Sequence, residues 1–302
     1  MKFSALGLLS AAADRVALLC SRFSESRTLA SELANENVVS ASDGKNTYLF
    51  NVANEVERWR AESLATKEAG TISWIRSVVH EGDVFVDVGA NIGLYSLVAA
   101  RHVGVSGMVY AFEPHAASFL SLLKNIDINE LGTIVRPLSC ALHFSESVLD
   151  FNYCNWLSGS SMSQLGSMID AEENEFVPVA SELKLSTTLD KLVKTGAIRT
   201  PTHVKIDVDG NESYVLRGME GVLRSPSRPE TIQVEINERY KADLFSYMES
   251  LNYEFVLRHD TALGKSRIEQ GADPNTISHN AIFRPAVTQD RSAERADPQQ
   301  RL

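Results

Sequence analysis

The feature that most constrains the fold is a short buried strand that leads into a glycine turn and then a helix. Residues 84–88 (VFVDV) are almost all apolar, as expected of a strand that is covered on both faces. Residues 89–93 contain two glycines, which permit a sharp turn, and residues 94–103 have the pattern of a helix. This order is typical of one unit of a parallel, helix-covered sheet.

The same alternation repeats along the chain and predicts an α/β, Rossmann-like doubly wound fold. Further strands are expected at residues 108–112, 133–136, 148–153, 203–208, 231–236, 253–257 and 280–283. Helices are expected from about residue 67 to 81 and at residues 94–103, 116–129, 188–194, 212–224 and 242–251.

Three regions are expected along the chain. Residues 1–66 form an N-terminal extension of uncertain structure, in which residues 47–52 could be an edge strand. Residues 67–284 form the main domain, and its segment 146–184 is interpreted as a strand followed by a mobile excursion that acts as a lid. Residues 285–302 are polar, without apolar periodicity, and are expected to be a disordered tail.

Composition excludes several classes of protein. The 302 residues are 44% hydrophobic and 23% charged, which suits a large globular domain. A net charge of −10 argues against nucleic acid as a partner. Three cysteines without a CxxC pair predict neither a disulfide framework nor a zinc site, and they favour a reducing, cytoplasmic location. We expect no transmembrane helix. Residues 2–13 have some features of a short signal peptide, but an amphipathic or docking helix is the preferred interpretation.

The turn after the first buried strand indicates a nucleoside-bearing cofactor. Gly89 and Gly93 precede a helix N-terminus, and Glu113, twenty residues after Gly93, ends the next strand, where it could accept both hydroxyls of a ribose. The dinucleotide fingerprint fails, because Asn91 stands where that motif needs glycine. Asp87 would also repel a pyrophosphate. An acidic residue there suits the sulfonium and ammonium groups of S-adenosylmethionine.

A second cluster, KIDVDGNE at residues 205–212, follows a later strand. Alternation places Lys205 and Asp207 on one face, and Asp209 and Glu212 follow in the next loop. These residues could form a network with shifted pKa values, or a purely structural ion-pair network. A calcium loop is excluded, because its first ligand would be Lys205. A third acidic cluster at residues 235–238 points to the same rim.

Four blocks together resemble the FkbM-type methyltransferases. They are residues 86–93 (VDVGANIG), 111–114 (AFEP), 188–190 (TLD) and 205–212 (KIDVDGNE), and the resemblance covers roughly residues 68–258. It implies a seven-stranded sheet with an antiparallel last strand, S-adenosylmethionine as donor, and O-methylation of a sugar, glycan or natural product. The residues that it places at the cofactor are Asp87, Gly89, Asn91, Gly93, Glu113, Pro114, Cys140 and Ala141.

The expected reaction is an in-line methyl transfer to a hydroxyl oxygen of a small-molecule or carbohydrate acceptor. Asp207, Asp209 and Glu212 are the candidates for the base, and Lys205 could serve as the base or hold the carboxylates. No metal site is predicted, although a metal bridging these carboxylates stays an alternative. The competing functions are a non-catalytic binding or scaffold protein with the same pocket and, more distantly, an NAD-dependent oxidoreductase. The oligomeric state is not predicted.

Overall fold

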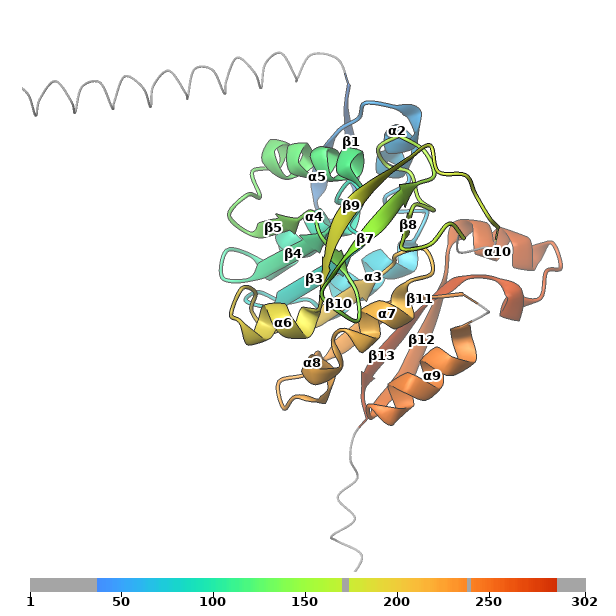
Figure 1. Ribbon diagram of the computed structural model, residues 1–302. Coiled ribbons are helices and arrows are strands. Elements are labelled where there is room, and N and C mark those ends of the chain that lie inside the picture. The colour runs from blue at the N-terminus through green and yellow to red at the C-terminus, as the bar shows by residue number, and fades with distance from the viewer. Residues whose placement is uncertain (1–36, 170–173, 238–239, 287–302) are drawn as a thin grey trace, which may run out of the picture.

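The computed structural model describes residues 37–169, 174–237 and 240–286 (Figure 1). The predictions of a signal-like or amphipathic segment at the N-terminus and of a disordered tail therefore fall almost wholly outside the described residues. Within the described parts, no helix is both long enough and apolar enough to cross a membrane.

The centre of the molecule is a seven-stranded sheet that confirms the predicted fold. Its strands lie in the order β12 (Tyr253–Asp260), β13 (His279–Pro285), β11 (Thr231–Ile236), β10 (His203–Ile206), β3 (Val84–Val88), β4 (Met108–Phe112) and β5 (Val135–Leu138). Strand β13 runs antiparallel to both of its neighbours, whereas β11, β10, β3, β4 and β5 are parallel. The order reverses at β3, so the carboxyl ends of β3 and β10 border the crevice where open α/β sheets bind ligands.

Helices cover both faces of this sheet, which explains why its central strands are apolar on both sides. One face is covered by α3 (Ala69–Val78), α4 (Leu94–Val103) and α5 (Ala116–Ile128). The other is covered by α6 (Leu189–Lys194), α7 (Glu212–Arg217), α8 (Glu220–Arg224) and α9 (Lys241–Ser250). The helix expected over residues 212–224 is thus split in two. Gly218 lies at the break, where a Cβ atom would come within 2.0 Å of the His143 carbonyl oxygen.

A second sheet replaces much of the excursion that we expected in residues 146–184. Its strands lie in the order β6 (Ala141–Leu142), β9 (Ala180–Thr187), β7 (Ser147–Tyr153) and β8 (Gln164–Leu165). Only β7 was anticipated. The pairing of β7 with β9 joins segments about thirty residues apart, and such non-local pairing leaves no local signal in the sequence. Residues 170–173 lie outside the described parts.

The described part of the N-terminal extension forms a hairpin and a helix. Strands β1 (Val38–Ser42) and β2 (Thr47–Asn51) pair with each other, and α2 (Glu55–Glu62) follows. The backbone N–H of Asn51 donates to Asn125 Oδ1 of α5 over 2.8 Å, so β2 is held by α5 and does not extend the main sheet. Tyr48 and Phe50 are fully buried in the same core as α3, α4 and α5. The domain boundary at residue 66 stays a prediction.

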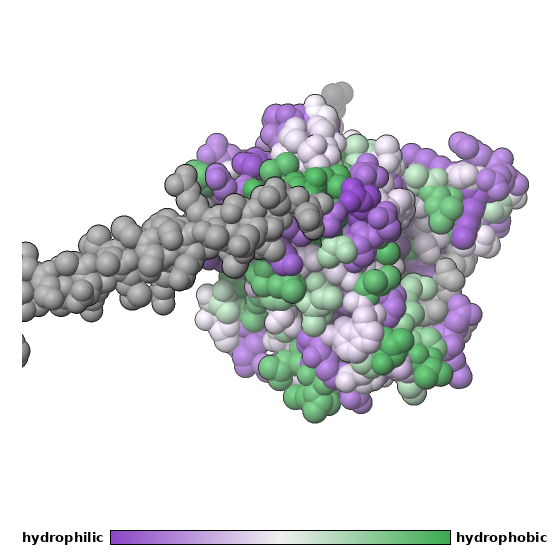
Figure 2. Space-filling view, turned by 90° about the horizontal axis from the view of Figure 1, so that it is seen from above, coloured by the Kyte–Doolittle hydropathy of each residue, from purple (hydrophilic) through white to green (hydrophobic). Residues whose placement is uncertain are grey.

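The connection between the last two strands carries α10 (Ala262–Glu269) and a short 3-10 helix, η2 (Pro274–Thr276). Figure 2, which views the molecule from above, shows hydrophobic residues in separate patches among hydrophilic ones.

Candidate active site

The glycine turn between β3 and α4 has a backbone conformation that few other residues could adopt. Gly89 has φ +80°, and a Cβ atom there would lie 1.8 Å from the carbonyl oxygen of Asp207. Gly93 caps α4 at φ +95°, and Asn91 between them has φ +52°. The turn is therefore tightly packed against the end of β10, and its left-handed residues explain why glycine is needed at its ends.

Glu113, at the end of β4, contacts this turn. Its carboxylate accepts hydrogen bonds from the backbone N–H groups of Asn91 and His115, each over 2.7 Å. Burial raises the pKa of Glu113 to about 7, because loss of hydration outweighs the two hydrogen bonds that stabilise the charged form. Asn91 also donates from Nδ2 to the carbonyl of Ser160 over 2.9 Å, which ties the turn to the loop before β8.

A pocket with a cavity volume of about 50 Å³ opens beside the turn. Its lining includes four of the residues predicted for the cofactor, namely Gly89, Pro114, Cys140 and Ala141. Sequence reasoning missed the rest of its wall, which includes Phe151 of β7, Leu165 of β8 and Asn211. Phe151 and Leu165 come from separate segments, so only their pairing in the second sheet could have revealed them, whereas Asn211 lies within the motif at residues 205–212. The pocket is partly apolar, as a site for a flat heterocycle should be.

Behind the turn lies a buried lysine between two carboxylates. Lys205 Nζ lies 3.4 Å from Asp87 Oδ1 and 3.2 Å from Asp207 Oδ2, and it sits 5.0 Å from the centre of the Tyr95 ring. Burial opposes the charge of Lys205, but the two carboxylates outweigh it and raise its pKa above the usual value. Ser96 donates to the other oxygen of Asp87 over 2.6 Å. A permanently charged Lys205 suits the holding role better than that of a base.

The two remaining predicted acids shape the loop after β10. Asp209, at φ +55°, accepts from the backbone N–H of Met162 over 2.8 Å. Glu212 Oε1 accepts from the backbone N–H groups of Val208 and Gly210 over 3.0 and 3.2 Å. Burial raises the pKa of Glu212 to about 7 despite these bonds. The structure thus brings all four predicted catalytic residues to one edge, but it engages Asp209 and Glu212 in local structure.

Several polar residues at the same edge were not predicted for the site. Glu68, which precedes α3, is buried and accepts from Asn280 Nδ2 of β13 over 3.4 Å. Gln233 of β11 is fully buried and donates to Thr71 Oγ1 of α3 over 3.0 Å. They lie in no motif, and the register of β10, β11 and β13 alone brings them together. The third acidic cluster gave a signal only for Glu235, the Cα partner of Asn280.

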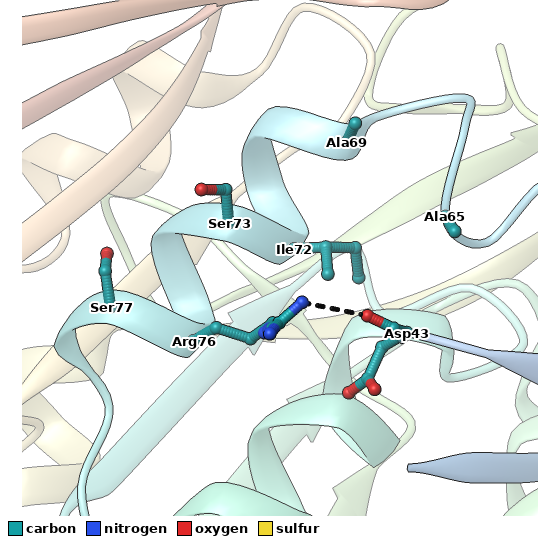
Figure 3. Close-up of a pocket in the computed structure, with 7 residues that line it drawn as sticks. All are labelled: Asp43, Ala65, Ala69, Ile72, Ser73, Arg76 and Ser77. Atoms are coloured by element: carbon teal, nitrogen blue, oxygen red, sulfur yellow. Dashed lines mark hydrogen bonds between the residues drawn. The ribbon is translucent and has the colours of Figure 1, made fainter. Parts of the chain in front are cut away.

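A second pocket, with a cavity volume of about 500 Å³, lies between the β1–β2 turn and α3 (Figure 3). Arg76 donates from Nη1 to the carbonyl oxygen of Asp43 over 3.1 Å at its edge. None of the predicted site residues lines it, and the chemistry expected from the motifs is absent from its walls. In the described parts of the chain, no group of three or more His, Cys, Asp or Glu residues is arranged to hold a metal ion.

Comparison with known proteins identifies the family of this chain. The Methyltransferase FkbM domain matches residues 87–255. Hexuronic acid methyltransferase AglP of Haloferax volcanii is 31% identical over 177 residues, which cover 58% of this chain and 66% of that protein. Methyltransferase sdnD of Sordaria araneosa is 29% identical over 160 residues, which cover 45% of this chain and 60% of that protein. The chain thus spans less than two thirds of the length of either relative.

Solved structures with similar folds share little sequence. A SAM dependent methyltransferase from Aquifex aeolicus has a TM-score of 0.42 and 10% identity, covering 77% of this chain and 97% of that one. Precorrin-6y C5,15-methyltransferase from Geobacter metallireducens has a TM-score of 0.41 and 11% identity, covering 72% and 86%. The fold assignment itself rests on the strand order above. The chain belongs to the FkbM methyltransferase family, and its methyl donor is S-adenosylmethionine.

Proposed function

We propose that this protein transfers a methyl group from S-adenosylmethionine to a hydroxyl oxygen of a sugar or a sugar-like small molecule. The observation that carries the proposal is the convergence of the Gly89 turn, Glu113 and the Asp87–Lys205–Asp207 array at one edge of the sheet. A relative named as a hexuronic acid methyltransferase supports a sugar as the acceptor.

The residues of the turn fit the donor. In our proposal Asp87, Gly89, Asn91 and Gly93 hold its methionine part, and Glu113 accepts hydrogen bonds from the ribose hydroxyls. Pro114, Cys140 and Ala141 contact the adenine, in keeping with their place on the wall of the pocket. The donor supplies a methyl group already activated by a positively charged sulfur, so the protein has mainly to align the reactants and exclude water.

The acceptor side lies at the ends of β10 and β11. We propose that Asp207, whose side chain is 27% exposed, faces the acceptor, while Lys205 keeps it charged and oriented. Burial opposes that charge, but the neighbouring Lys205 holds the pKa of Asp207 below its usual value. Asp209 and Glu212 form the floor of this region through their loop hydrogen bonds. Residues 67–284 form the catalytic unit in this proposal, and residues 37–66 pack on it.

Binding and turnover separate this proposal from its competitors. Calorimetry with S-adenosylmethionine and S-adenosylhomocysteine tests the pocket, and release of S-adenosylhomocysteine with a panel of neutral and acidic glycosides tests the reaction. Asp207→Asn should bind both nucleosides as the wild type does and lose turnover. Binding without turnover on any hydroxylated acceptor would favour the scaffold alternative. Stabilisation by NAD but not by S-adenosylmethionine would favour the oxidoreductase.

A further inference from the structure

Besides Asp87 and Glu113, whose partners are described above, five described carboxylates gather at the carboxyl edge of the sheet, and four of them have partners. Asp207 is paired with Lys205, and Asp209 and Glu212 accept backbone hydrogen bonds. Glu68 is paired with Lys67 over 2.9 Å and also accepts from Asn280. Among the residues that the structure describes, no hydrogen bond or ion pair engages the fifth, Glu235. A carboxylate that has no partner at the carboxyl edge of the sheet is free to exchange a proton with a ligand.

The strand register places Glu235 next to the reaction region. Lys205 of β10 is the Cα partner of both Asp87 and Gln233, so these three residues form one row across β3, β10 and β11. Glu235 is two residues beyond Gln233 and therefore lies on the same face, one row closer to the carboxyl edge. Asp207 is two residues beyond Lys205 and belongs to the same second row. Glu235 thus faces the region between the donor turn and α3.

The surroundings of Glu235 are built to hold a carboxyl group in place. Its Cα partner Asn280 is buried, and the Asn280 amide is oriented by Glu68. Below it, Gln233 is fixed by its hydrogen bond to Thr71. Glu235 itself is only partly buried, so a ligand can reach it.

We propose that Glu235 is the catalytic base of this enzyme, a role that rests on the proposed function. As the acceptor oxygen forms its bond to the methyl carbon, its proton moves to the Glu235 carboxylate. The carbon–sulfur bond of the donor breaks with its electron pair remaining on sulfur, which becomes a neutral thioether. The step needs no further reactant, and the proton then passes from Glu235 to solvent.

The electrostatics agree with this assignment. Burial, followed by the nearby carboxylates of Asp207, Glu212, Asp209 and Glu68, raises the pKa of Glu235 well above its usual value. A carboxylate with a raised pKa is a stronger base than an ordinary one, which improves general-base catalysis near neutral pH. Asp207 differs, because Lys205 lowers its pKa and weakens it as a base.

The test compares Glu235→Gln with the wild type and with Glu230→Gln, an exposed acid just before the same strand. Methyl transfer is followed by S-adenosylhomocysteine release, with methyl α-D-glucopyranoside and methyl α-D-glucuronopyranoside as acceptors. We expect Glu235→Gln to lower kcat at least about 100-fold, as is typical for loss of a general base. KM and the affinity for S-adenosylhomocysteine should stay unchanged, and Glu230→Gln should behave as the wild type. A kcat for Glu235→Gln within fivefold of the wild type would overturn the proposal.

A second measurement does not depend on turnover. Infrared difference spectra between wild type and Glu235→Gln, both bound to S-adenosylhomocysteine, report the protonation of this one carboxyl group as pH is varied. Titration well above the usual range of a glutamate supports the assignment, and titration within that range refutes it. If the wild type methylates neither glycoside, the proposed sugar acceptor fails, and this titration alone decides the role of Glu235.

Discussion

Replacing Lys205 with methionine should destabilise the protein strongly, because Lys205 compensates a carboxylate that has no access to water. Asp87 is fully buried, and its carboxylate pairs with Lys205 and accepts a hydrogen bond from the Ser96 hydroxyl. Removing one partner of a buried ion pair typically costs about 3–5 kcal/mol, since the other charge remains buried. For a domain of this size that corresponds to a fall in Tm of about 6–20 °C.

Thermal and urea unfolding of Lys205→Met at pH 7.5 would measure this loss. The double variant Lys205→Met/Asp87→Asn should recover much of it, because no buried charge is then left without a partner. Lys191→Met is the matched control. Lys191 pairs with Glu146 over 3.3 Å at the surface, where its side chain is 48% exposed, and such pairs contribute about 0–1 kcal/mol.

The reasoning would be refuted if Lys205→Met and Lys191→Met unfolded at the same temperature. It would also fail if the double variant were less stable than Lys205→Met, because the charge on Asp87 would then not be the source of the cost. Measuring S-adenosylhomocysteine affinity in each folded variant shows whether the array also orders the donor site.

Three further results are expected. Gly89→Ala should lose about 2–5 kcal/mol in urea unfolding, from its left-handed φ and the clash with the Asp207 carbonyl, and a wild-type midpoint would contradict the geometry. Because the pKa of Glu113 is raised to about 7 in the folded state, its protonated form adds about 3 kcal/mol to the free energy of unfolding below pH 4.5. This contribution should be lost as pH rises through 7 in the wild type but not in Glu113→Gln, and urea unfolding from pH 4 to 8 would measure it. In the second sheet, Phe151→Ala should lower the free energy of unfolding by about 3–5 kcal/mol, because the Phe151 side chain is only 3% exposed. Leu183→Ser should lower it by less than about 0.5 kcal/mol, because Leu183 is 72% exposed. Equal midpoints in thermal unfolding would show that β7 and β9 are not packed as described.

The main sheet could be predicted because its strands carry their signal locally. Strands β3, β4 and β11 and helix α4 have the bounds expected from their runs of apolar residues and the glycines beside them. The turn at Gly89 was also predictable, because a sharp turn after a doubly covered strand demands glycine. Alternation along one strand placed Lys205 and Asp207 on one face, whereas the pairing of β3 with β10 is what brings Asp87 to Lys205.

The second sheet, the hairpin before α2 and the acceptor edge could not be predicted in this way. Strand β9 has exposed leucines at alternate positions and pairs with a distant segment, so its pattern does not distinguish it from a surface loop. Glu68, Glu235 and Asn280 are far apart along the chain, and only Glu235 lies in a cluster that the sequence singles out.

The sequence by itself therefore determined the alternation of strands and helices in the main sheet, the donor turn and the chemistry of the donor, because these depend on short runs of residues. The tertiary structure alone decided which carboxylates are already engaged and which one is free, because hydrogen-bond partners depend on strand register and helix packing. Position along the chain made Asp207, Asp209 and Glu212 the candidates for the base. In our proposal that role belongs to Glu235, which the register of β11 and β13 places beside them.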